Sequence, residues 1–115
     1  MHGDNFITIQ KKLIMKKVIV QFNIPGMTAK QYDQAWVDLR AAGESNPIGL
    51  LYHAGGPQGN NWVVVDVWES VGAFTKYGET LMPILAKLGV AVAEVKPVIT
   101  PVHFEYSGAE EPIAH

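Results

Sequence analysis

The hydrophobic pattern is clearest over residues 61–70, which read NWVVVDVWES. In an extended strand Trp62, Val64 and Trp68 share one face and the intervening valines share the other, because side chains alternate along a strand. A strand that is apolar on both faces needs a cover on each side of its sheet. The segment therefore predicts a buried strand that passes directly into a helix capped by Ser70.

Alternation of apolar and polar residues predicts three further strands. They span residues 17–23, 48–54 and 95–106. The glycine-rich stretch 55–59 (GGPQG) is typical of a turn, so the second and third strands should form a hairpin. Pro97 and Pro101 favour an edge position for the last strand, because proline has no N–H to donate to a neighbouring strand.

Apolar residues at helical spacing predict a first helix that begins after Thr28 and ends at Gly43. Thr28 and Gln31 match a capping box, in which each side chain accepts a hydrogen bond from the other residue's backbone N–H. Met27 and Tyr32 hold the two positions of a hydrophobic staple. Glycine at position 43 is typical of the residue that ends a helix.

The second helix should begin after Ser70, break at Gly78, restart at Thr80 and stop at Gly89. The element order is then β-α-β-β-α-β, which predicts an α+β fold of the ferredoxin-like type. Such a fold has a four-stranded antiparallel sheet with both helices on one face. The other face of the sheet stays apolar, so we expect a second copy of the chain to cover it in a homodimer.

The 115 residues suffice for one domain, which we place at residues 15–106, between an N-terminal extension (1–14) and a mobile C-terminal tail (107–115). The net charge of −2 argues against nucleic acid and anionic membranes as partners. The chain has no cysteine, which excludes disulfides, thiolate catalysis and cysteine-ligated zinc. No apolar run is long enough to cross a membrane and no secretory signal is evident, so we expect a cytoplasmic protein.

Four short segments carry a resemblance to a known family. They are residues 65–70 (VDVWES), 74–78 (FTKYG), 81–85 (LMPIL) and 101–103 (PVH). The region that contains them resembles the antibiotic-biosynthesis-monooxygenase-like (ABM-like) domains of the dimeric α+β barrel superfamily, and is most similar to uncharacterised members. The resemblance implies that the sheets of two subunits pack face to face into a dimeric α/β barrel with the helices outside.

That superfamily includes cofactor-independent monooxygenases, isomerases of small lactones, haem-degrading enzymes and stress-responsive proteins. The resemblance therefore implies a small-molecule enzyme of the monooxygenase or isomerase type, acting without a cofactor on a small aromatic or polyketide-like compound. The alternative is a non-catalytic dimeric barrel that binds a small ligand or responds to stress. A shared fold does not choose between the two, because function depends on the site.

Two of the four histidines lie inside predicted strands and are candidate general bases, because imidazole exchanges protons near neutral pH. His53 lies near the end of the second strand and His103 inside the fourth. Asp66 interrupts the apolar third strand and is a candidate to orient a histidine or a water. If the hairpin pairs His53 with Trp62, then His53 and Asp66 share a face, and a shift by one residue separates them. Equally open are structural histidines with every bond satisfied, and an Asp66 that accepts hydrogen bonds from a loop or a helix end.

Five aromatic side chains could hold a planar ligand. They are Trp36, Trp62, Trp68, Phe74 and Tyr77. Aromatic residues at this spacing are also typical of an ordinary core. A metal site of His53, His103 and Asp66 is disfavoured, because this fold puts the second and fourth strands at opposite edges. RNA recognition is disfavoured as well, since a carboxylate interrupts the strand on which bases would stack. Haem ligation by a single histidine is left open by the resemblance.

Overall fold

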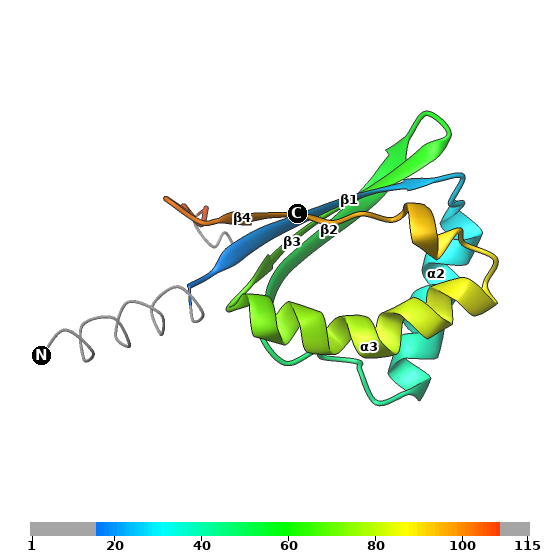
Figure 1. The fold of residues 1–115 in the computed structure, drawn as a ribbon, viewed down its shortest axis with the longest axis horizontal. Coiled ribbons are helices and arrows are strands. Elements are labelled where there is room, and N and C mark those ends of the chain that lie inside the picture. Colours follow the sequence, from blue (N-terminus) through cyan, green and yellow to red (C-terminus); the bar gives the residue numbers. More distant parts are fainter. Residues whose placement is uncertain (1–15, 109–115) are drawn as a thin grey trace, which may run out of the picture.

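The computed structural model describes residues 16–108 of the chain. Its elements are β1 (Val18–Pro25), α2 (Ala29–Ala41), β2 (Leu50–Gln58), β3 (Asn61–Trp68), α3 (Val71–Lys87), the short 3-10 helix η1 (Val92–Glu94) and β4 (Val98–Pro101). The predicted β-α-β-β-α-β order and the α+β, ferredoxin-like class are confirmed. The sheet forms one layer and α2 and α3 form the other, so one face of the sheet carries no helix (Figure 1).

The sheet is antiparallel and its strand order is β2-β3-β1-β4. The predicted interior position of the third strand and the predicted edge position of the last strand are therefore confirmed. Strands β1 and β3 pair along their whole length, from Val18 opposite Trp68 to Pro25 opposite Asn61. Strands β2 and β4 form the two edges of the sheet. The expectation that the second and fourth strands lie at opposite edges is therefore confirmed.

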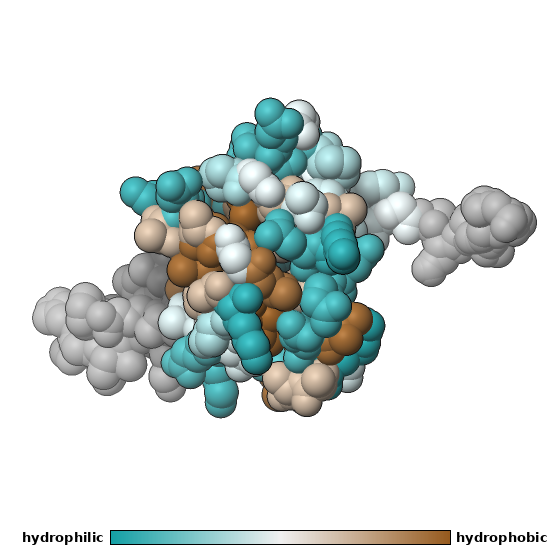
Figure 2. Space-filling view, turned by 90° about the vertical axis from the view of Figure 1, so that its right-hand side faces the viewer, coloured by the Kyte–Doolittle hydropathy of each residue, from teal (hydrophilic) through white to brown (hydrophobic). Residues whose placement is uncertain are grey.

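Burial alternates strictly along β3. Trp62, Val64, Asp66 and Trp68 are buried on the face that the helices cover, and the three valines between them are only half-buried on the other face. The core lies between sheet and helices, and its most deeply buried large side chains are Val20, Leu39 and Trp68. On the side where α2, the end of α3 and η1 lie, apolar side chains are visible at the surface among hydrophilic ones (Figure 2). The core therefore reaches the surface at this end of the molecule.

The ends of α2 follow the sequence closely. The capping box is confirmed: the Thr28 side chain accepts from the Gln31 backbone N–H at 3.1 Å, and the Gln31 side chain accepts from the Thr28 N–H at 2.9 Å. Gly43 ends the helix with a φ of +88°, a conformation that residues with a Cβ rarely adopt. These caps fix the start and the rotation of α2, and hence which of its side chains meet the sheet.

The predicted turn at residues 55–59 is wrong. Strand β2 continues to Gln58, and the turn is the two-residue connection Gly59–Asn60. Gly59 has a φ of +60°, as the first central residue of a tight type II′ hairpin turn requires. Glycines and Pro57 are tolerated inside β2 because an edge strand can leave one side of its backbone unpaired. Their turn-like composition concealed the longer strand.

Two further element boundaries were predicted wrongly. Helix α3 is continuous, with Gly78 and Pro83 in its interior, because burial of Phe74, Tyr77 and Leu85 outweighs the modest local preference for a break. Gly89 does end this segment, with a φ of +89°. Strand β4 has only four residues, so most of the predicted strand 95–106 is irregular. The predicted extension at residues 1–14 lies outside the described residues, as does nearly all of the predicted tail at 107–115.

Candidate functional site

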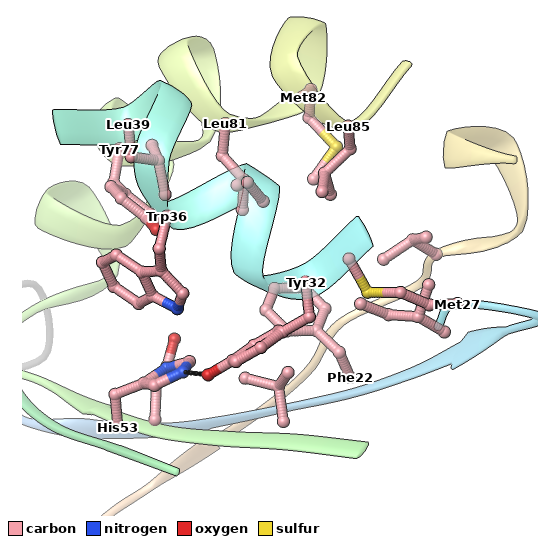
Figure 3. A pocket seen from close by; sticks show the side chains of 15 residues that line it. Phe22, Met27, Tyr32, Trp36, Leu39, His53, Tyr77, Leu81, Met82 and Leu85 are labelled. Carbon is pink, nitrogen blue, oxygen red and sulfur yellow. Dashed lines mark hydrogen bonds and ion pairs between the residues drawn. The ribbon is translucent and has the colours of Figure 1, made fainter. Parts of the chain in front are cut away.

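A cavity lies between the sheet and the two helices, and Figure 3 shows its walls. Apolar side chains dominate its lining, and the polar exceptions are His53, Asp66 and the phenol groups of Tyr32 and Tyr77. The cavity has a volume of about 480 Å³ when its open mouth is included, but only about 40 Å³ of this space is accessible to a water-sized molecule. In this conformation the cavity therefore has room for very small molecules, and an aromatic ligand requires a side chain to move.

His53 and Asp66 lie directly opposite each other on neighbouring strands. The register pairs His53 of β2 with Asp66 of β3, and not with Trp62, the pairing that was considered from the sequence as a condition for a shared face. The two residues nevertheless share the helix-facing side of the sheet, because the true and the expected register differ by an even number of residues. The imidazole Nδ1 and the carboxylate Oδ1 are 2.6 Å apart.

Both oxygens of Asp66 have partners. Oδ1 contacts His53, and Oδ2 accepts a hydrogen bond of 3.1 Å from the indole Nε1 of Trp68. Asp66 is 3% exposed and Trp68 is completely buried, so this pair anchors the carboxylate beneath α3. The expectation that Asp66 accepts from a loop or a helix end is wrong, because its partners are side chains of the sheet.

Tyr32 completes the cluster and was not predicted as a site residue. Tyr32 lies near the start of α2 and points toward the sheet (Figure 3). Its hydroxyl oxygen is 2.5 Å from Nε2 of His53. A carboxylate can only accept, so Nδ1 of His53 carries the proton shared with Asp66. In the neutral ring Nε2 is then an acceptor, and the Tyr32 hydroxyl donates to it. The result is a chain of hydrogen bonds running Tyr32–His53–Asp66–Trp68.

The cavity keeps its two phenols neutral. Burial raises the pKa of Tyr32 above its ordinary value; the indole of Trp36 opposes this shift, while the charges of Asp66 and Asp33 reinforce it. Burial also raises the pKa of Tyr77, with the charge of Asp66 as the next contribution. Near neutral pH Tyr32 is therefore a hydrogen-bond donor and not a phenolate base.

The five predicted aromatic residues fall into two groups. Trp36 and Tyr77 line the cavity, and the Trp36 ring meets the His53 ring edge-on with centroids 5.1 Å apart. Trp62, Trp68 and Phe74 are not part of the lining. Trp68 packs between Phe74 and Tyr77, and Trp62 packs on Tyr32 with ring centroids 4.8 Å apart. The second group supports the walls of the cavity from behind.

His103 does not join this cluster. It lies beyond the end of β4 and is exposed, so its predicted position inside a strand is wrong. Residues 16–108 contain no group of three histidine, aspartate or glutamate side chains that could hold a metal ion. Within the same residues, neither helix is long and apolar enough to cross a membrane.

Comparison with known proteins relates the chain to others by structure. No protein-family model and no curated protein sequence matches it. A provisionally assigned antibiotic biosynthesis monooxygenase from Caulobacter crescentus is similar with a TM-score of 0.55 and 16% identity, over 92% of this chain and all of the other. A dimeric ferredoxin-like protein from an uncultured marine organism has a TM-score of 0.55 and 12% identity, over 87% of this chain and 99% of the other.

A third similar structure is SnoaB, a cofactor-independent oxygenase from Streptomyces nogalater. Its TM-score is 0.51 and its identity 15%, over 80% of this chain and 96% of the other. At such identities the likeness establishes a shared fold. The chain thus has the ferredoxin-like fold found in antibiotic-biosynthesis-monooxygenase proteins, as the resemblance of its sequence implied.

Proposed function

We propose that the protein is a homodimeric small-molecule enzyme of the cofactor-independent monooxygenase or isomerase type, acting on a small aromatic or polyketide-like compound in the cytoplasm. One observation carries the proposal. His53 lies in an apolar cavity, with Nδ1 held by a buried carboxylate and Nε2 directed at a hydroxyl group. An imidazole oriented in this way is suited to act as a general base. The shared fold with a cofactor-independent oxygenase supports the same class.

The chemistry begins with removal of a proton from a phenolic or enolic substrate. The proton passes to Nε2 of His53, and the imidazolium that forms is stabilised by Asp66, whose position Trp68 fixes. Trp36 and Tyr77 hold the ring of the substrate. The electron-rich anion then rearranges or reacts with dioxygen. At an activated methylene, one oxygen atom becomes the carbonyl oxygen and the other leaves as water with the two methylene hydrogens, so no external reductant is needed.

Turnover by a His53 variant tests the proposal. A screen of phenols, quinols and small lactones, followed by oxygen consumption and product analysis, should identify a substrate. His53→Ala should then lower kcat by about 100-fold or more, the ordinary contribution of a general base. His103→Ala provides a matched control and should keep full turnover, because His103 is exposed and is not among the residues that line the cavity. Equal turnover by wild type and His53→Ala would contradict the proposed role.

The proposal of a homodimer rests on the apolar residues of the helix-free face of the sheet. Ile19, Val63, Val65 and Val67 give this face an apolar centre, and Tyr52 and Val98 extend it toward the edges. A sheet face of this kind is ordinarily covered. One of the similar structures is of a dimeric ferredoxin-like protein, which supports a second copy of the chain as the cover.

The alternative function is a non-catalytic barrel that binds a small ligand or responds to stress. It is favoured by the engagement of both imidazole nitrogens of His53 and by the small free volume of about 40 Å³. A compound that binds with a measurable Kd and is recovered unchanged after prolonged incubation in air would support this alternative.

A further inference from the structure

The glycine at position 55 leaves a hollow in the wall of the sheet. Gly55 lies two residues beyond His53 on β2 and opposite Val64, so its missing side chain would point toward the helices. A Cβ placed there would lie 2.8 Å from the hydroxyl oxygen of Tyr32 and 3.0 Å from the indole Nε1 of Trp62. Any side chain at position 55 would therefore displace the Tyr32 hydroxyl. We call this place the Gly55 hollow.

Two polar groups flank the Gly55 hollow. On one side is Nε2 of His53, which accepts a hydrogen bond from the Tyr32 hydroxyl. On the other is the indole N–H of Trp62, which is buried and has no hydrogen-bond partner within residues 16–108. A buried donor without an acceptor is costly and uncommon in folded proteins. The hollow thus brings together a proton acceptor, an unused donor and the hydroxyl oxygen of Tyr32, which fills the place of the missing side chain.

We propose that the Gly55 hollow binds the acidic hydroxyl of a phenolic or enolic ligand, and that the Tyr32 hydroxyl occupies the hollow when no ligand is bound. The inference rests on the proposed role of His53 as proton acceptor. The ligand oxygen displaces the tyrosine oxygen and lies closer to Trp62 than that oxygen does, so that it gives its proton to Nε2 of His53 and accepts a hydrogen bond from the Trp62 indole N–H. The ligand O–H bond breaks and the His53 N–H bond forms. The oxyanion is then stabilised by the Trp62 N–H, a contact that the Tyr32 hydroxyl does not make.

The exchange of Tyr32 for the ligand is chemically balanced, because one phenol replaces another. It also explains the small free volume of the cavity, since the ring of Tyr32 occupies part of the space that the ligand would need. Gly55 is exposed along the edge strand β2, so the hollow lies near solvent and the displaced side chain has a direction in which to move. Tyr32 then excludes compounds that cannot compete for His53, which makes it a specificity-determining residue.

Binding of para-nitrophenol, whose phenolate is coloured, tests this inference without any need for turnover. The control ligand is para-nitrotoluene, which has a similar shape and no acidic hydroxyl. In Trp62→Phe, which keeps an aromatic ring at this position and removes the N–H, binding of the phenol should weaken about tenfold or more, while binding of para-nitrotoluene stays unchanged. In Tyr32→Phe, which removes the competing hydroxyl, binding of the phenol should tighten by about tenfold.

Gly55→Ala fills the hollow and should abolish the preference for the phenol over para-nitrotoluene. If Gly55→Ala does not fold, the Trp62→Phe comparison decides alone, because that variant loses no satisfied hydrogen bond. Phenol affinity that ignores both Trp62→Phe and Tyr32→Phe would overturn the inference, and so would a failure of the phenol to bind either wild type or Tyr32→Phe. If phenol affinity changes in these variants as expected but no compound is turned over, the proposed ligand site is supported and the proposed enzymatic function is contradicted. If a compound is turned over but phenol affinity is the same in wild type and in these variants, the enzymatic function is supported and the proposed ligand site is contradicted.

Discussion

At the scale of single residues, Asp66 is the polar side chain on which the candidate site depends. It is almost completely buried and accepts from both Trp68 and His53. Asp66→Leu leaves both donors without an acceptor, so it should lower the free energy of unfolding by about 1–3 kcal/mol. Urea melts measure the difference. Asp33→Leu, at an exposed position of α2, is the control and should change stability by less than about 0.5 kcal/mol. A neutral or stabilising Asp66→Leu would mean that the carboxylate is solvated.

Single residues also show where reasoning from the sequence succeeds and where it stops. Asp66 and His53 could be selected because a polar side chain is unusual within an apolar strand. Their contact depended on the hairpin register, which a turn of uncertain length does not determine. Tyr32 could not be selected, because a tyrosine on the apolar face of a helix is ordinary. Its hydroxyl becomes informative only once α2 is placed over β2, beside Gly55.

At the scale of elements, local composition predicted both helices and all four strands but not the short η1, and it misplaced several ends. Periodicity located both helices and all four strands, and the side-chain caps at Thr28 and Ser70 fixed the helix starts correctly. The errors in α3 and β2 arose where glycine or proline lies inside the element. Such residues cost only about 1 to 3 kcal/mol in a helix interior, and burial of one apolar face can offset this. Helix α3 and strand β2 both continue through positions that read locally as breaks.

Gly78 allows a direct test of the continuous α3. The residue is interior to the helix, and a Cβ placed on it meets no atom within 4 Å. Gly78→Ala should therefore raise the free energy of unfolding by about 0.5–1 kcal/mol, because alanine loses less backbone entropy in a helix. Thermal or urea unfolding measures the change. Gly43→Ala is the contrasting variant and should destabilise, since Gly43 has a φ of +88°. A Gly78→Ala variant that destabilises would show that the helix is broken there.

At the scale of the whole molecule, the helix-free face of the sheet determines the expected assembly. Val65 lies at the centre of this face, between Gln21 of β1 and Ala54 of β2. Light scattering at micromolar concentration should give twice the chain mass of 12.6 kDa. Val65→Asp places a charge at the centre of the interface and should give the single chain mass. Val37→Asp, on the exposed surface of α2, is the control and should remain dimeric. A wild type that remains a monomer would refute the proposed barrel.

The position of the hydrogen-bonded chain from Tyr32 to Trp68 has a consequence for such an assembly. All four residues come from one chain and lie on the helix side of the sheet, away from the face proposed to be shared. Each subunit would then hold a complete reaction centre. Substrate saturation should be hyperbolic, with no communication between the two subunits. A hybrid dimer with one wild-type chain and one His53→Ala chain should keep half of the maximal rate, and its KM should equal that of the parent.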